Sequence, residues 1–212
     1  MSDQVRITRR GLFRGLGSAT LLSGPLSGCR SPDTQNATTT PPEPTAAPAR
    51  IAGVGPGPAP LQFTLNGEAK TIEVAPHVTL LAALREHVQA TGTKMVCDRG
   101  ACGACTVLVD GVPRNSCMML AHDVAGAQVT TVEGLAKGGE LSPLQEAFVR
   151  HDALQCGFCT SGMLMSCEAL LRRKRTGVTR EDVEQAIAGN LCRCGTYPNV
   201  VAAVLEVAKG TG

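Results

Sequence analysis

The spacing of hydrophobic and polar positions changes several times along the chain. Residues 61–74 alternate as strands do, and Asn66-Gly67 within them is a strong signal for a hairpin turn. Apolar residues then recur at helical spacing from Pro76 to Val88. They would share one face of a helix: Leu80, Leu81, Leu84 and Val88. The pattern predicts a hairpin followed by a helix packed across a sheet.

A second hairpin is expected around Asp110-Gly111, with a strand from Thr106 to Val109 before it. If Val109 pairs with Val112, then Cys105 pairs with Ser116, and Cys117 returns beside the loop that precedes the hairpin. Residues 129–132 (Val-Thr-Thr-Val) are all β-branched, which predicts a last strand that completes the sheet.

Four short helices are predicted beyond residue 140, enough for a small bundle. Their expected starts are Ser142-Pro143 with Gln145 as a capping box, Thr160 or Ser161, Thr179, and Pro198. The first should end near His151 and the third at Gly189. The fourth would turn one face inward: Val200, Val201, Val204, Leu205 and Ala208.

Residues 1–29 have the pattern of an export signal, with basic residues ahead of a short apolar stretch. Arg9-Arg10 followed by two apolar residues after Gly11 resembles the twin-arginine signal, a route to the periplasm for folded proteins. Leu26-Ser27-Gly28-Cys29 resembles a bacterial lipobox. Acylation of Cys29, which would tether the chain to a membrane, and simple cleavage nearby both stay open. Residues 30–60, rich in Pro, Thr and Ala, are expected to form a flexible tether.

Composition and charge narrow the function classes. Aromatic residues make up only 2% of the chain, which argues against stacking platforms for nucleic acid. The net charge is +2, and the leader alone carries about +3, so the remainder shows no basic footprint for nucleic acid. The basic run Arg172 to Arg175 is best explained as the solvated end of a helix.

The first candidate site is the segment Cys97 to Cys105, whose C-x4-C-x2-C spacing is that of the plant-type [2Fe–2S] loop. Gly100 and Gly103 suit a backbone that must turn closely around a cluster. Small alanines leave amide N–H groups free to point at the sulfurs. The expected ligands are Cys97, Cys102, Cys105 and Cys117. The Gly-rich loop and its uneven spacing favour iron–sulfur over zinc or disulfides.

The second candidate site joins two cysteine pairs, Cys156 with Cys159 and Cys192 with Cys194, each just before a predicted helix. Helix N-termini favour anionic, thiolate-ligated clusters. The pairs alone leave zinc and iron–sulfur nearly balanced, and the neighbouring first site makes a second [2Fe–2S] cluster the simpler interpretation. Cys167 fits neither set and is expected to be a buried core thiol.

Three segments together closely resemble the small subunit of the xanthine dehydrogenase and aldehyde oxidoreductase family: Cys97 to Cys105, Gln155 to Cys159, and Gly189 to Cys194. The resemblance covers about residues 61–208. It implies an α+β fold, with a β-grasp ferredoxin domain at 61–138 and a four-helix [2Fe–2S] domain at 139–212. It also implies a large partner subunit carrying molybdopterin, as the cytosine dinucleotide, and often a FAD-binding subunit.

The family pattern gives the sites an order. The helical-domain cluster lies nearer molybdenum, the plant-type cluster lies further along the electron path, and Gln155 matches the residue that touches the pterin. No catalytic residue is expected in this chain. Ser161 and the run Gly195-Thr196-Tyr197-Pro198 depart from the xanthine-type pattern. They look more like the periplasmic aldehyde oxidoreductase or isoquinoline oxidoreductase branch.

Three functions compete. The first is an electron-transfer subunit of an enzyme that oxidises aldehydes to carboxylic acids, or N-heterocycles of the isoquinoline type. The second is a free-standing exported electron carrier, which would need only the first domain. The third is a disulfide-stapled exported binding protein. The helical domain and Gln155 favour the subunit.

Overall fold

The structure is a computed structural model that describes residues 55–210. The predicted export leader, the modification of Cys29 and residues 30–54 of the predicted tether lie outside these residues. Within the described part of the chain, no helix is both long and apolar enough to cross a membrane.

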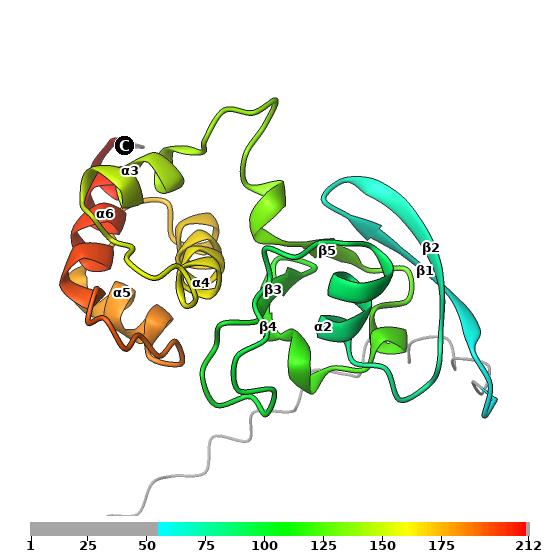
Figure 1. The fold of residues 1–212 in the computed structure, drawn as a ribbon. Helices are drawn as coiled ribbons and strands as arrows, with labels where there is room; N and C mark the ends of the chain where they lie inside the picture. Colours follow the sequence, from blue (N-terminus) through cyan, green and yellow to red (C-terminus); the bar gives the residue numbers. More distant parts are fainter. Residues whose placement is uncertain (1–54, 211–212) are drawn as a thin grey trace, which may run out of the picture. The chain divides into compact units, whose positions relative to one another are not determined.

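A five-stranded sheet forms the first half of the described chain, in the order β2-β1-β5-β3-β4 (Figure 1). The strands are β1 (Ala59–Leu65), β2 (Glu68–Val74), β3 (Thr106–Val109), β4 (Val112–Asn115) and β5 (Gln128–Thr130). Both predicted hairpins are present, and Asn66 and Gly67 turn the first one with positive φ angles of 52° and 90°.

The last strand is shorter than predicted, since it covers residues 128–130 and not 129–132. β5 ends at Thr130, because Val132–Gly134 turns into a short 3₁₀ helix. It lies between β1 and β3, parallel to the first and antiparallel to the second. The segment joining β4 to β5 contains two further 3₁₀ turns, Ser116–Met118 and Ala121–Val124.

The helix predicted over 76–88 is shorter than expected. α2 (Leu80–Ala82) continues directly into a π-helical turn, η1 (Ala83–His87). Thr79 forms a β-bridge with Leu120 and caps α2 through a 3.2 Å hydrogen bond from the Ala82 N–H, so the backbone before it is not available for a helix. The predicted apolar face is otherwise correct, since Leu80, Leu81 and Leu84 are fully buried.

Four helices follow in the described part beyond residue 140: α3 (Pro143–Arg150), α4 (Thr160–Arg173), α5 (Arg180–Ile187) and α6 (Tyr197–Gly210). The predicted capping box of Ser142 and Gln145 is present, and Thr179 caps α5 as expected. The predicted cap of α4 was wrong. Cys159 occupies the N-cap position without a capping side chain, and Thr160 and Ser161 lie inside the helix.

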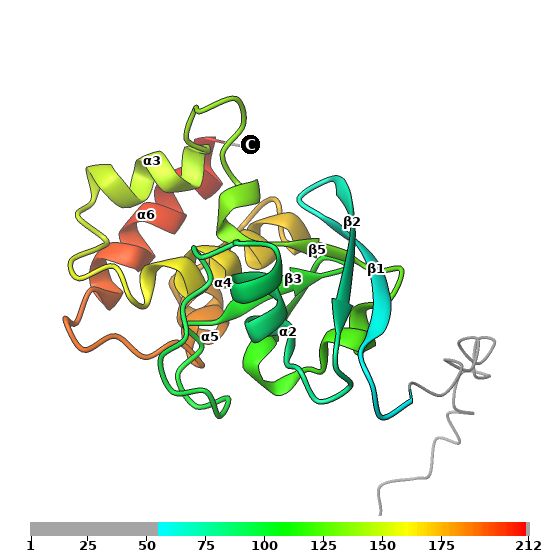
Figure 2. The same cartoon turned by 45° about the vertical axis from the view of Figure 1, so that its right-hand side comes forward.

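α4 is the central element of the helical part. It contacts β3 of the sheet on one side and α5 and α6 on the other, while α3 packs against α6 (Figures 1 and 2). One apolar core, including Met163, Met165 and Phe148, fills the helical part and reaches Leu108 of β3. A second core lies between the sheet and α2. The fold is therefore α+β, with a ferredoxin-type sheet followed by a helical domain.

Candidate metal centres

The strand register brings the fourth cysteine of the first set back to the loop. Val109 pairs with Val112, as predicted from the turn. Ser116 then donates two hydrogen bonds to the carbonyl oxygen of Cys105, from its N–H at 3.3 Å and from its hydroxyl at 2.7 Å. Cys117, one residue further, is buried against Cys105 and Leu81. The hairpin thus closes the loop around four thiols.

The sulfurs of this first set come together as two pairs. The thiol of Cys97 is hydrogen-bonded to that of Cys102, and the thiol of Cys105 to that of Cys117. A [2Fe–2S] cluster held by four cysteines takes two thiolates on each iron. The grouping of the four thiols into two pairs is compatible with such a cluster.

Backbone amides of the loop point at these sulfurs. The Gly100 N–H donates to Sγ of Cys117 at 3.3 Å, while the Ala101 and Ala104 N–H groups reach Cys97 and Cys102. Gly100 and Gly103 make these turns with φ angles of +73° and +66°. The loop therefore presents partial positive charge to the place where negatively charged thiolates would gather.

The second set also forms two pairs, each joining the two segments that contribute to it. The thiol of Cys159, at the N-terminus of α4, is hydrogen-bonded to that of Cys192. The thiol of Cys156 is hydrogen-bonded to that of Cys194, and both of these residues are exposed. The segment 192–194 leads into α6, so both halves of this set lie close to helix N-termini, as predicted.

The pKa values of two buried thiols are raised, whereas that of Cys192 is lowered. Burial raises the pKa of Cys117 to about 11 and that of Cys159 to about 12. At Cys192 burial also acts upward, but hydrogen bonds from Thr196, Cys159 and Cys194 outweigh it and lower the pKa to about 7. Metal binding needs deprotonated thiols, so iron would offset the desolvation of the buried ones.

The two cysteine sets touch through the backbone. The Leu191 N–H donates to the carbonyl oxygen of Cys102 at 2.9 Å. The side-chain amide of Asn190 donates to the carbonyl oxygen of Gly103 at 2.9 Å, and the Ser161 hydroxyl to that of Ala104 at 3.3 Å. A ligand position of one set, Cys102, is therefore one hydrogen bond away from the residue next to Cys192 in the other.

Two further observations fit bound clusters. All nine cysteines that the structure describes carry free thiols, so the eight of the two sets are available as ligands. The Thr160 hydroxyl, next to Cys159, is one of two buried side-chain oxygens or nitrogens in the described residues that have no hydrogen-bond partner. A buried hydroxyl without a partner calls for a missing acceptor, and a cluster sulfur would supply one.

The structure also gives the places of the other residues that the sequence singled out. Cys167 is fully buried in the helical core, as expected. Gln155 is exposed beside Cys156, so its side chain is open to a partner chain. Arg172 and Arg173 lie in the last turn of α4, where Arg172 pairs with Glu168 at 2.8 Å.

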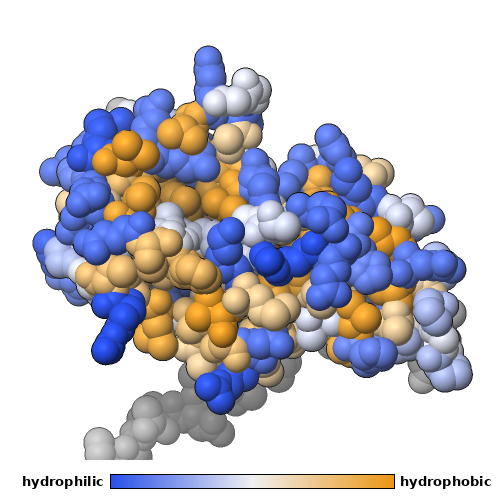
Figure 3. Space-filling model, viewed as in Figure 1, coloured by the Kyte–Doolittle hydropathy of each residue, from blue (hydrophilic) through white to orange (hydrophobic). Residues whose placement is uncertain are grey.

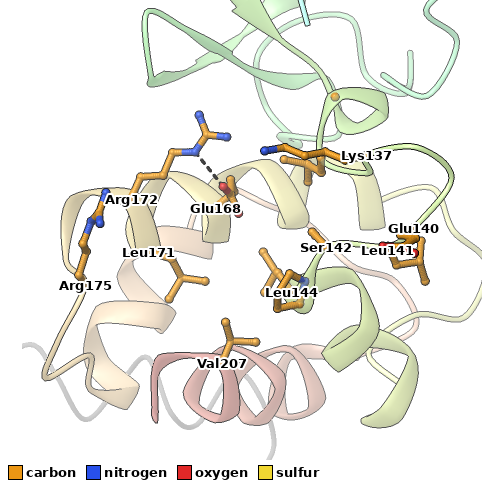
Figure 4. A pocket seen from close by; sticks show the side chains of 13 residues that line it. Lys137, Glu140, Leu141, Ser142, Leu144, Glu168, Leu171, Arg172, Arg175 and Val207 are labelled. Carbon is orange, nitrogen blue, oxygen red and sulfur yellow. Dashed lines mark hydrogen bonds and ion pairs between the residues drawn. The ribbon is translucent and has the colours of Figure 1, made fainter. Parts of the chain in front are cut away.

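A groove of about 590 Å³ lies between the 134–144 segment, the end of α4 and α6 (Figure 4). Leu144, Leu171 and Val207 form its apolar part, and the Arg172–Glu168 pair lies at its side. No cysteine is among its lining residues. The molecular face in Figure 3 carries scattered hydrophobic patches among hydrophilic residues.

Sequence reasoning missed the residues that connect the two sets. Asn190 is buried and bonded both to Gly103 and, at 2.8 Å, to the Ser166 hydroxyl. The available signal was its place in the segment Gly189 to Cys194, one of the three that resemble the family. Thr196 was noted only as a departure from a family pattern, and Ser161 only as such a departure and as a possible helix cap, yet both residues bond to a cysteine set or its loop.

Comparisons with known proteins agree with this geometry. Residues 63–135 match the model of the 2Fe-2S iron-sulfur cluster binding domain, and residues 131–205 match that of the [2Fe-2S] binding domain. The aldehyde oxidoreductase iron-sulfur-binding subunit PaoA of Escherichia coli K12 is 42% identical over 163 residues, covering 70% of this chain and 71% of that protein. The nicotine 6-hydroxylase small subunit of Paenarthrobacter nicotinovorans is 49% identical over 146 residues, covering 69% and 87%.

A solved structure is similar to the same extent. The crystal structure of quinoline 2-oxidoreductase from Pseudomonas putida 86 contains a chain that is 42% identical and superposes with a TM-score of 0.67. The alignment covers 72% of this chain and 97% of that one. With two [2Fe–2S] domains in this order and relatives at this identity, the chain belongs to the family of iron–sulfur small subunits of molybdenum hydroxylases.

Proposed function

We propose that this chain carries electrons from a molybdopterin site on a large partner subunit, through two [2Fe–2S] clusters, to a FAD-binding subunit or an external acceptor. The proposed ligands of the first cluster are Cys97, Cys102, Cys105 and Cys117. Those of the second are Cys156, Cys159, Cys192 and Cys194. The observation that carries the proposal is the hydrogen bond from the Leu191 N–H to the Cys102 carbonyl oxygen, which joins the two sets.

Each cluster, when bound, would take up and release one electron at a time. The residues of this chain supply the rest. The cysteines provide the ligands, and the Gly100, Ala101 and Ala104 amides offset their negative charge. The Asn190 and Leu191 bonds hold the two sets at a fixed separation. The chain offers no catalytic residue in this account, so substrate oxidation takes place on the partner.

The surface around the second set is suited to the large subunit. Phe158 and Leu191 lie beside the exposed Cys156 and Cys194 in sequence, and each is 59% exposed. Large apolar side chains left this exposed beside a candidate redox site favour a protein interface. Gln155, in the same segment, is in a position to reach the pterin that the partner would carry, as the family resemblance implies.

The first set has an exposed apolar border of its own, formed by Met95, Val96, Met118 and Leu120. This border supports a second interface, on the side of the electron acceptor. The order of transfer in the proposal is therefore molybdopterin, second cluster, first cluster, acceptor.

For the substrate we propose aldehydes oxidised to carboxylic acids, with molybdopterin cytosine dinucleotide on the large subunit. The likeness to PaoA and the departures at Ser161 and Gly195 to Pro198 support this choice. An N-heterocycle of the isoquinoline type is the second candidate, favoured by the nicotine 6-hydroxylase and quinoline 2-oxidoreductase relatives. The hypothesis of a free-standing carrier explains neither the helical domain nor the exposed apolar side chains of Phe158 and Leu191 beside the second set.

Rapid mixing of the assembled complex with an aldehyde tests the order of transfer. In a Cys102→Ser complex, substrate should still produce the paramagnetic signal of the second cluster, while turnover with the acceptor is lost. In a Cys159→Ser complex, substrate should reduce neither cluster although dithionite still reduces the first. Cys167→Ala, a cysteine outside both sets, should behave as wild type. Reduction of the first cluster by substrate in the Cys159→Ser complex would overturn the order, and hydroxylation by this chain alone would overturn the subunit role.

Gln155→Ala tests the proposed contact with the pterin. Because Gln155 is exposed and donates no described hydrogen bond to the cysteine loops, its loss should leave both clusters intact. Reduction of the second cluster by substrate should slow by about tenfold, or the complex should retain less molybdenum, as expected for a supporting contact to a cofactor. Unchanged reduction rate and unchanged molybdenum content would reduce Gln155 to a surface residue.

A further inference from the structure

Thr196 lies directly before α6 and faces a cysteine of the second set. Only 3% of the residue is exposed. Its Oγ1 is 3.3 Å from Sγ of Cys192, which is the only hydrogen-bond partner of this hydroxyl among the described residues. The threonine backbone N–H also donates to the same sulfur. Two donors of one residue therefore converge on Cys192.

The surrounding bonds fix this geometry. The Thr196 carbonyl oxygen accepts the Val200 N–H at 3.0 Å, which anchors it to the first turn of α6. The Tyr197 hydroxyl accepts the Cys192 N–H at 2.8 Å and donates to the Asn190 carbonyl oxygen at 3.2 Å. The backbones of Cys192 and Thr196 are thus anchored within the same short segment.

The direction of the hydrogen bond follows from the chemistry of a ligand. In a free thiol, either Cys192 or Thr196 could donate the proton. A cysteine that ligates iron has lost its proton, so Thr196 must donate. This step rests on the proposed function, in which Cys192 is a cluster ligand.

We propose that Thr196 sets the reduction potential of the second cluster, through the hydrogen bond that its hydroxyl donates to Cys192. One electron enters the cluster on reduction and no bond forms or breaks, so the negative charge on the sulfurs rises. A donor to a ligand sulfur stabilises this more negative state and raises the potential. Thr196 thereby makes the second cluster a better acceptor for electrons from the partner, and acts as a positioning residue that touches no substrate.

A single isosteric exchange isolates the hydroxyl. Thr196→Val keeps the size and branching of the side chain and removes only the donor, leaving the backbone N–H in place. We expect the ratio of reduced to oxidised second cluster at a fixed potential to fall by roughly tenfold, which is ~59 mV for a one-electron couple. Thr196→Ser retains the hydroxyl and should restore most of the wild-type value.

The measurement is a potentiometric titration of the full-length, cluster-loaded chain, followed by electron paramagnetic resonance. The signal of the second cluster is identified as the one that Cys159→Ser removes. The other signal, from the first cluster, serves as an internal reference and should not shift. Thr64→Val on β1, whose hydroxyl bonds to no sulfur among the described residues, is the matched control.

The outcomes separate the two proposals. A second-cluster potential that is lower in Thr196→Val and restored in Thr196→Ser supports the inference. Equal potentials in wild type and Thr196→Val, with both signals present, overturn it and leave the electron-transfer function untouched. A wild-type chain with no second signal contradicts the proposed cluster itself. If Thr196→Val loses its second cluster, Thr196→Ala, which also lacks the donor, is titrated in its place, and a second-cluster potential equal to that of wild type overturns the inference.

Discussion

At Gly103 the two cysteine sets approach so closely that no side chain fits between them. A Cβ atom added there would lie 2.5 Å from the Gly189 carbonyl oxygen and 2.6 Å from Nδ2 of Asn190. From the opposite side, a Cβ on Gly162 would collide with the Gly103 carbonyl oxygen. These two glycines allow the backbone of one set to rest on the helix that carries the other.

Gly103→Ala should therefore lower the free energy of unfolding by more than the backbone strain of a left-handed alanine alone would. The control is Gly111→Ala, which has a similar positive φ of +79° but open space around the added carbon. We expect Gly111→Ala to cost about 1–2 kcal/mol, the usual penalty for a left-handed residue with a side chain. Gly103→Ala should cost at least about 3 kcal/mol, because the atoms it meets are backbone and a buried amide.

Urea denaturation of the loaded proteins, together with iron content, measures this difference. Gly111→Ala should keep its iron and Gly103→Ala should lose part of it. Equal stability and equal iron content in the two variants would mean that the close approach of the two sets is not required.

At the residue scale, the spacing of the cysteines was enough to predict the ligand positions. It was not enough to predict which side chains donate hydrogen bonds to the ligand sulfurs. The C-x4-C-x2-C run and the Asp110-Gly111 turn were enough to place Cys117 beside the loop. The contact between the Thr196 hydroxyl and the Cys192 sulfur depends on how the chain turns into α6. The sequence alone does not show which sulfur this hydroxyl contacts.

At the scale of elements, the Asn190 side chain is one of several connections between the two domains, beside the packing of α4 on β3. It links the loop of the first set, at Gly103, with Ser166 in the middle of α4. Both bonds are buried, where an unpaired amide costs about 1–3 kcal/mol. The segment after α5 is therefore tied to both domains just before it supplies Cys192.

Asn190→Ala should change the magnetic interaction between the two reduced clusters. Such an interaction falls steeply with separation, so it reports whether the two sets remain at a fixed distance. We expect weaker or heterogeneous splitting in the paramagnetic resonance spectrum of Asn190→Ala. Ser166→Ala removes one of the two bonds and keeps the one to Gly103, so its spectrum should match wild type. Identical splitting in all three proteins would show that Asn190 does not set the separation.

Elements with strong local signals were predicted well, and those decided by tertiary contacts were not. The capping box of Ser142 and Gln145 and the cap at Thr179 are local and formed as expected. α2 starts late because Thr79 pairs with Leu120, some forty residues away in sequence. α4 starts at Thr160 without a capping side chain, because the preceding residue is the candidate ligand Cys159.

At the scale of the whole molecule, we propose that the chain is exported to the periplasm in folded, cluster-loaded form. The support is the Arg9-Arg10 pair and the apolar stretch that follows it. Arg9→Lys with Arg10→Lys should trap the protein in the cytoplasm, because lysine cannot reproduce the planar guanidinium. Arg6→Lys with Arg14→Lys, the same exchange outside the pair, should leave export intact. Cell fractionation decides, and equal export of both double variants would contradict the proposal.

The lipobox-like Leu26 to Cys29 predicts a second feature of the mature protein. If Cys29 is acylated, the chain begins there with lipid on a tether of about 30 residues, which spans roughly 30 Å on average. Mass spectrometry of the mature N-terminus should find lipid on Cys29, and Cys29→Ser should release the protein from the membrane fraction. An unmodified terminus downstream of Cys29 would remove the anchor and leave export standing.

We propose that two separate sets of four cysteines each hold a [2Fe–2S] cluster. The most direct test of this proposal is paramagnetic resonance of the dithionite-reduced full-length chain, combined with iron and acid-labile sulfide analysis. We predict four iron atoms and four acid-labile sulfides per chain, from two domains with one cluster each, and two distinguishable signals. Cys102→Ser should remove one signal and Cys159→Ser the other, while Cys167→Ala keeps both. Stoichiometric zinc, a single signal, or the loss of both signals in Cys167→Ala would contradict it.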